Sequence, residues 1–122
     1  MNIENVIEEL KKANPEWDGE YHYNDDAKWL NLDNTNVSDL TPLKGMPLKV
    51  LWLINTNVSD LTPLKGMPLE ELDLVNTNIS DLTPLKGMPL EWLDLAGTPA
   101  AKKPLPKWLD GVDVYGHNLK GK

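Results

Sequence analysis

Two acidic side chains in this sequence have the spacing of an acid–base pair. Asp73 and Asp94 occupy the same place in successive copies of a repeat. Neighbouring strands lie ~4.8 Å apart, so the two carboxyls would lie about 5 Å apart, the separation typical of retaining glycosidases. Such chemistry also needs a pocket that raises the pKa of one carboxyl. A flat, open strand array provides none, so we expect two solvated acids, no catalytic residues and no enzyme activity.

Metal and cofactor sites are not predicted either. Calcium needs six or more oxygen ligands, which a flat array of strands does not gather. His22 and His117 are isolated from each other, and the chain has no cysteine. The glycine-rich phosphate motifs and the H-E-x-x-H zinc motif are missing from the sequence.

Composition narrows the class of partner. The 122 residues are the length of one domain, 40% of them are hydrophobic, and the net charge is −7. Binding to nucleic-acid phosphates needs clustered Lys and Arg, so we expect no nucleic-acid partner. We find no apolar run long enough to span a bilayer and no signal peptide, and expect no membrane partner. The lack of cysteine is consistent with cytoplasmic expression but leaves the compartment unknown.

The elements that position these acids come from an internal repeat. The segment NTNVSDLTPLKGMPL at 34–48 recurs at 55–69 and 76–90, with one changed position, Val37, Val58 and Ile79. A fixed period of 21 residues also separates Leu30, Leu51, Leu72 and Leu93, and such a period is typical of a solenoid. Apolar residues recur every three positions between these leucines, which favours 3₁₀ turns over an α-helix.

The spacing Leu48-x-x-Leu51-x-Leu53-x-x-Thr56-x-Val58 resembles the leucine-rich repeat family, in its short bacterial form, with Thr where Asn or Cys is more common. The resemblance implies an α/β solenoid. Its parallel β-sheet would lie on the concave side, with strands near 29–33, 50–54, 71–75 and 92–96. Loops and 3₁₀ turns would return along the convex side.

We predict three parts in the chain. Residues 1–27 would form an N-terminal cap, with a helix over 2–13 followed by a short strand and turn, because a solenoid must cover its first core edge. Residues 28–98 would hold the repeats. Residues 99–122 would form a C-terminal cap that ends in a mobile polar tail from about Gly116. Trp17 and Trp108 would cover the two ends of the core.

The polar residues repeated in the turns are predicted to be structural. Asn34, Asn55 and Asn76 form one column, and Thr35, Thr56, Thr77 and Thr98 form another. Turn backbone groups need hydrogen-bond partners, so we expect these side chains to supply them as ladders. The column Asp39, Asp60 and Asp81 would form turn hydrogen bonds rather than bind metal.

The copies differ at the strand positions that point away from the leucines. The framework is constant while one face changes, which indicates that this face was varied by selection or by design. We favour an engineered consensus version of the repeat. The variable positions are Trp29, Asn31, Asp33, Val50, Trp52, Ile54, Glu71, Asp73, Val75, Trp92, Asp94 and Ala96.

The chemistry of this face favours a binding function. Tryptophan is enriched at binding hot spots, and a cluster of several hundred Å² of apolar surface usually marks an interaction site. We expect Trp52 to be the central anchor, with acidic residues around the apolar cluster. The predicted partner is a protein or peptide with apolar anchors and basic residues. The alternatives are self-association through the same face, or a structural scaffold with no natural ligand.

Overall fold

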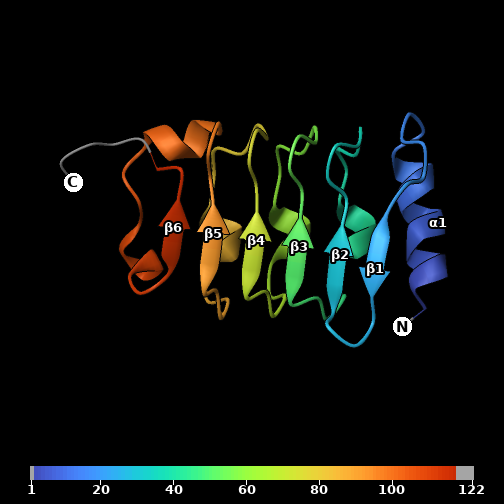
Figure 1. Ribbon diagram of the computed structural model, residues 1–122, viewed down its shortest axis with the longest axis horizontal. Helices are drawn as coiled ribbons and strands as arrows, with labels where there is room; N and C mark the ends of the chain where they lie inside the picture. The colour runs from blue at the N-terminus through green and yellow to red at the C-terminus, as the bar shows by residue number, and fades with distance from the viewer. Residues whose placement is uncertain (1, 118–122) are drawn as a thin grey trace.

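The computed structural model describes residues 2–117 and is built around one β-sheet, whose six strands are neighbours in chain order (Figure 1). Strands β1 and β2 pair antiparallel, and each later pair is parallel. A sheet of consecutive short strands is compatible with the predicted α/β repeat solenoid. The strands are β1 (His22–Asn24), β2 (Trp29–Asn31), β3 (Val50–Trp52), β4 (Glu71–Asp73), β5 (Trp92–Asp94) and β6 (Asp113–Tyr115).

Helix α1 (Ile3–Ala13) lies at the N-terminal end of the row of strands (Figure 1). The Asn2 side chain accepts a hydrogen bond from the Glu4 backbone N–H at 2.8 Å, which caps the first turn. Leu10 is buried, and α1 packs against the turn Thr41–Leu43 of the first repeat. The helix ends at Asn14, the residue before a proline, as the sequence predicts.

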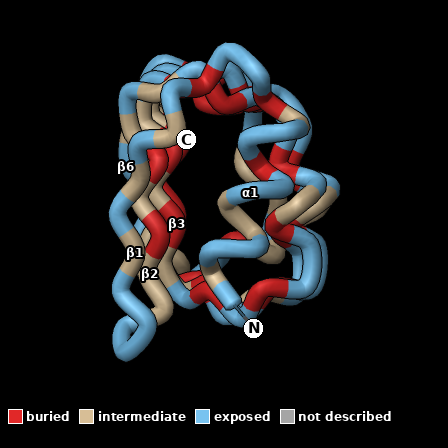
Figure 2. Tube along the Cα trace, turned by 90° about the vertical axis from the view of Figure 1, so that its right-hand side faces the viewer, coloured by how far each residue is buried: buried red, intermediate tan, exposed pale blue. Residues whose placement is uncertain are grey.

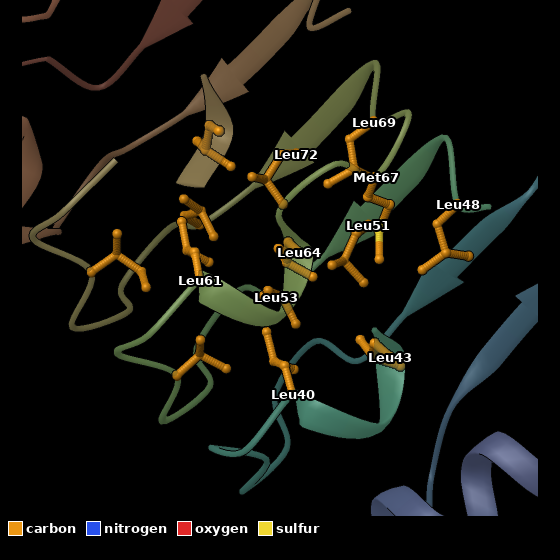
Figure 3. Close-up of a cluster of buried hydrophobic side chains, with 14 of the residues drawn as sticks. Leu40, Leu43, Leu48, Leu51, Leu53, Leu61, Leu64, Met67, Leu69 and Leu72 are labelled. Atoms are coloured by element: carbon orange, nitrogen blue, oxygen red, sulfur yellow. The ribbon is translucent and has the colours of Figure 1, made fainter. Parts of the chain in front are cut away.

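The core lies between the sheet and the returning turns (Figure 2). The strand register advances by one repeat at each pairing, so Leu30, Leu51, Leu72 and Leu93 stack side by side, all fully buried. Leucines of the turns meet them from the other wall (Figure 3). Each repeat therefore buries its apolar side against its neighbours.

The return paths contain the 3₁₀ turns that the three-residue spacing predicts. They span Thr41–Leu43, Thr62–Leu64 and Thr83–Leu85, and two further turns, Pro99–Lys102 and Lys107–Leu109, follow the last repeat. In each of the first three, the aspartate two residues before the threonine accepts its backbone N–H at 2.9 Å. The turn role predicted for Asp39, Asp60 and Asp81 is confirmed.

The threonine column bonds to turn backbone groups as predicted, whereas the asparagine column forms a ladder between its own side chains. The four threonine hydroxyls of the column donate to the leucine carbonyl three residues earlier, at 2.6–2.9 Å. Asn55 donates to Asn34 at 2.7 Å and Asn76 donates to Asn55 at 2.9 Å. The three asparagines have φ near +60°, a conformation that asparagine tolerates better than most residues.

The strands span three residues where the sequence predicts about five. Beyond the strand ends, backbone bonds between neighbouring repeats continue on one side, as from Leu32 N–H to the Trp52 carbonyl at 2.9 Å, while side chains accept other backbone N–H groups. The division into caps and repeats stays a prediction, and most of the predicted tail, residues 118–122, lies outside the described residues. Between residues 2 and 117, no helix is long and apolar enough to cross a membrane.

Candidate binding face

The side chains that alternate with the buried leucines point to the side of the sheet opposite the core. Figure 2 shows the helix and the turns on the core side of the strands, with no described part of the chain beyond the other side. We call this second side the open face. Its strand residues are His22 and Asn24 of β1, Trp29 and Asn31 of β2, Val50 and Trp52 of β3, Glu71 and Asp73 of β4, Trp92 and Asp94 of β5, and Asp113 and Tyr115 of β6. It also includes the partly buried residues that follow four of the strands, Asp33, Ile54, Val75 and Ala96.

The aromatic residues of the open face form two separate pairs. Trp29 and Trp52 pack edge to face, with ring centroids 5.3 Å apart and an interplanar angle of 79°. Trp92 packs instead against Tyr115, at 5.7 Å and 39°. The ring of Trp92 therefore packs against β6 on its far side, and the predicted role of Trp52 as the central anchor stays a prediction. We refer to these as the first and second aromatic pairs.

Tyr115 is a member of the open face that the sequence analysis did not place there. Half of its surface is exposed, more than for any other large apolar side chain among residues 2–117. It lies beside Asp94 in the register of β5 and β6. The signal was present in the sequence, because Tyr115 follows Asp94 by the same 21 residues that separate the repeats.

Acidic side chains occupy the space between the two aromatic pairs. Strand β4 contributes Glu71, which is exposed, and Asp73, whose neighbours in register are Trp52 and Asp94. In the described part of the chain, the ion pairs are Lys12–Glu9 and Lys28–Asp25, at 3.2 and 3.4 Å. None of the open-face acids takes part, so no ion pair within residues 2–117 compensates this negative charge. We call Glu71, Asp73 and Asp94 the acidic centre.

Asp73 is more buried than a residue on an open sheet face is expected to be. Only 8% of its surface is exposed. Loss of solvation raises the pKa of its carboxyl to about 6, and the nearby charges of Asp94 and Asp33 add to the effect, while the hydrogen bond from Val75 opposes it. Burial also raises the pKa of Asp33. The expectation of two solvated acids is thus wrong for Asp73.

Several open-face side chains also hold the backbone at the strand ends. Asn31, Asp73 and Asp94 each accept the backbone N–H two residues later, at 2.8, 3.1 and 3.0 Å. These local bonds compete with the strand ladder and turn the chain. Three residues predicted only as partner contacts therefore have a structural function as well.

The second repeat shows why Asp33 is needed. Trp52 occupies the position at which the other repeats have Asn or Asp, and its side chain has no acceptor. The carboxylate of Asp33 reaches across from the preceding repeat and accepts the Ile54 N–H at 2.8 Å. The sequence signal was Trp52 itself, because it stands where the other repeats have an acceptor side chain, so another residue must accept the backbone N–H.

The first aromatic pair leaves two polar groups without partners. The indole Nε1 atoms of Trp29 and Trp52 are buried and form no hydrogen bond within the described chain. Buried donors in native proteins usually have a partner, and an unpaired one costs about 1–3 kcal/mol. Neither the sequence pattern nor the alternation of the strands predicted this.

Pockets and metal sites were also sought elsewhere on the described surface. One hollow of about 260 Å³ lies at the junction of the last repeat and the C-terminal segment, where Ser80, Lys103 and Trp108 line it, away from Asp73 and Asp94. Within residues 2–117, no three His, Asp or Glu side chains are grouped to hold a metal ion.

Comparisons with known proteins do not assign the chain. No model of a known protein family matches it, and a search of curated proteins gives no match. Its function is therefore inferred from the open face.

Proposed function

We propose that this chain is a leucine-rich repeat binding module whose open face, on the concave side of the solenoid, takes up a peptide or protein segment with apolar anchors and basic residues. The family assignment comes from the leucine and threonine spacing of the repeats. The near-identity of the three copies favours a designed or consensus origin, because neutral change would also alter the turns.

The observation that carries the proposal is the placement of Asp73. This residue is 8% exposed, forms no ion pair with any lysine of residues 2–117, and lies in register between Trp52 and Asp94. A buried carboxylate without a counter-charge opposes folding. Titratable groups whose pKa is shifted by burial cluster at functional sites. A basic group from a partner would supply the missing positive charge.

The two aromatic pairs supply the apolar part of the surface. Tryptophan and tyrosine give large contact areas with few rotatable bonds, so a partner orders them at low entropic cost. Two such pairs, one on each side of the acidic centre, favour a partner that alternates apolar and basic groups over a uniformly apolar one.

Self-association of this face is the second candidate, together with a structural scaffold that has no ligand. Tyr115 favours it, because this exposed aromatic lies on β6 at one edge of the sheet. The acidic centre opposes it, because two copies meeting face to face would bring like charges together. We therefore prefer a different, basic partner.

A charge reversal at Glu71 tests the proposal with little risk to the fold, because Glu71 is exposed. The parent, Glu71→Lys and the control Glu8→Lys would each be panned against a library of random displayed heptapeptides. Glu8 is also exposed but lies on α1. We expect basic, apolar peptides to be retained by the parent and by Glu8→Lys, and to be lost by Glu71→Lys.

Light scattering on the same proteins tests the alternative. A monomeric parent that retains peptides agrees with the proposal. A parent dimer that dissociates in Glu71→Lys and in Trp52→Ala would replace it with self-association. Peptides that bind all three proteins equally would place binding outside the open face, and failure to enrich any peptide would favour the scaffold.

A further inference from the structure

We propose that the open face recognises an extended segment crossing its strands, with an apolar side chain at one position, a Lys or Arg two residues later and a second apolar side chain two residues after that. This inference rests on the proposed binding function. It goes further because it specifies the order and spacing of the groups in the partner.

The spacing of the partner's side chains follows from the distance between the strands that carry the two aromatic pairs. The first aromatic pair spans β2 and β3, and the second spans β5 and β6. The midpoints of the two pairs are three strand spacings apart, which is about 14 Å at ~4.8 Å per spacing. Strand β4, with Glu71 and Asp73, lies halfway between them.

An extended peptide matches this distance. Four residues rise about 13.5 Å at ~3.4 Å each, and side chains two residues apart point to the same side. With its first and fifth side chains on the aromatic pairs, the peptide would place its third side chain over β4. A shift of one residue would turn that side chain away from the sheet.

The positive charge expected at the third position of the peptide follows from the acidic side chains that would surround it. Asp73 faces Asp94 from β5 and is also influenced by the charge of Asp33 from the first repeat, while Glu71 is exposed on the same strand. No described lysine pairs with any of these acids. A single Lys or Arg placed there would approach several carboxylates at once, next to the indole of Trp52, where a cation over the ring face gains further stabilisation.

The test uses the full chain and four pools of labelled heptapeptides, measured by fluorescence polarisation. The first pool has Leu, Trp or Tyr at the first and fifth positions of the motif, Arg or Lys at the third, and Ser between. The second moves the basic residue to the second position. The third replaces it with Gln, and the fourth shortens the apolar spacing by one residue.

We expect the first pool to bind the parent at least about tenfold more tightly than each of the other three, since a desolvated charge pair commonly contributes that much or more. In Asp73→Asn this preference should fall below about threefold. Asp110→Asn, which removes an exposed charge outside the open face, should keep it.

The outcomes separate the inference from the proposed function. Equal binding of the first and third pools, still sensitive to Glu71→Lys, would overturn the basic centre and leave the binding face intact. Equal binding of the first and fourth pools would overturn the spacing. If no pool binds the parent up to 1 mM, both the inference and the proposed function fail.

Discussion

Replacing Asp73 with asparagine should stabilise the protein at neutral pH. Only 8% of the surface of Asp73 is exposed, so the substitution removes a buried charge. It keeps a side-chain oxygen that accepts the Val75 N–H. Asparagine already occupies the equivalent position in the first repeat, as Asn31, and forms the same bond at 2.8 Å. The change therefore isolates the charge.

The magnitude follows from the pKa of this carboxyl. Its value rises from 3.8 in the unfolded chain to about 6 in the folded protein. Each pKa unit corresponds to ~1.4 kcal/mol, so the ionised group destabilises the fold by about 3 kcal/mol once the pH exceeds both values. Because the folded pKa is the higher one, this destabilisation is absent below pH 3.8, grows as the pH rises from 3.8 to 6, and is complete above 6.

The assay is urea unfolding followed by tryptophan fluorescence at pH 7.5, 6.0 and 4.0. We expect Asp73→Asn to exceed the parent in free energy of unfolding by about 2–3 kcal/mol at pH 7.5 and by only about 0.6 kcal/mol at pH 4.0. Taking the difference at each pH cancels the acids that do not interact with Asp73, including Asp39, Asp60 and Asp81, whose pKa values are lowered by hydrogen bonds.

A control variant is available in the next strand. Asp94→Asn removes the same charge and keeps the same kind of bond, to the Ala96 N–H, but Asp94 is less buried than Asp73. Asp94→Asn should therefore change the free energy of unfolding by less than Asp73→Asn at pH 7.5. If Asp73→Asn gives the same stability change at pH 7.5 and 4.0, or destabilises the protein at pH 7.5, burial of the Asp73 charge is not the cause.

Three further substitutions test the framework by urea unfolding. Asn14→Ala should lower the free energy of unfolding by about 3 kcal/mol, because the Asn14 side chain forms four bonds of 2.9 Å to backbone groups. One of them, to residue 10, closes the end of α1, and the three to residues 38 and 39 join α1 to the first repeat. An effect below about 1 kcal/mol would show that water replaces these bonds. Gly97→Ala should destabilise by at least about 2 kcal/mol, since φ is +78° and the new Cβ would overlap Asn76 Oδ1. Its control is Gly45→Ala, where φ is +83° and nothing lies within 4 Å; similar losses at both sites would exclude the overlap as the cause. Asp33→Ala should cost about 1–2 kcal/mol by leaving the Ile54 N–H unpaired, whereas Asp33→Asn should cost less, and equal losses would contradict the cross-repeat bond.

The repetitive part of the fold was predictable because each residue there meets the same neighbours in every copy. A leucine at the second strand position meets the leucine 21 residues away, so its burial follows from the period alone. The same holds for the 3₁₀ turns and for the asparagine and threonine ladders, whose partners are local or are identical residues one repeat away.

The open face was predictable in membership but not in arrangement. Strand alternation places Trp92 there, yet whether its ring packs toward β4 or β6 depends on the size of Tyr115, outside the obvious repeat. The burial of Asp73 depends likewise on the large side chain beside it, at Trp52. The clamp formed by Asn14 joins residues 24 and 25 positions apart, and no periodicity connects them.

The contrast between framework and open face bears on how this sequence arose. The asparagine, threonine and aspartate columns of the turns each form hydrogen bonds that stabilise the fold. The open face, by contrast, holds an acid at Asp73 and two buried indole N–H groups that find no partner within residues 2–117. A sequence optimised only for stability would place an asparagine at position 73, since the first repeat already has that solution in Asn31. Retention of the charge in an otherwise regular scaffold is most simply explained by a partner that neutralises it. Binding of a basic ligand should then narrow the stability difference between the parent and Asp73→Asn at pH 7.5, by about 1.4 kcal/mol for each tenfold preference in affinity for the parent. If the ligand leaves the full difference between them, the charge at Asp73 does not take part in recognition.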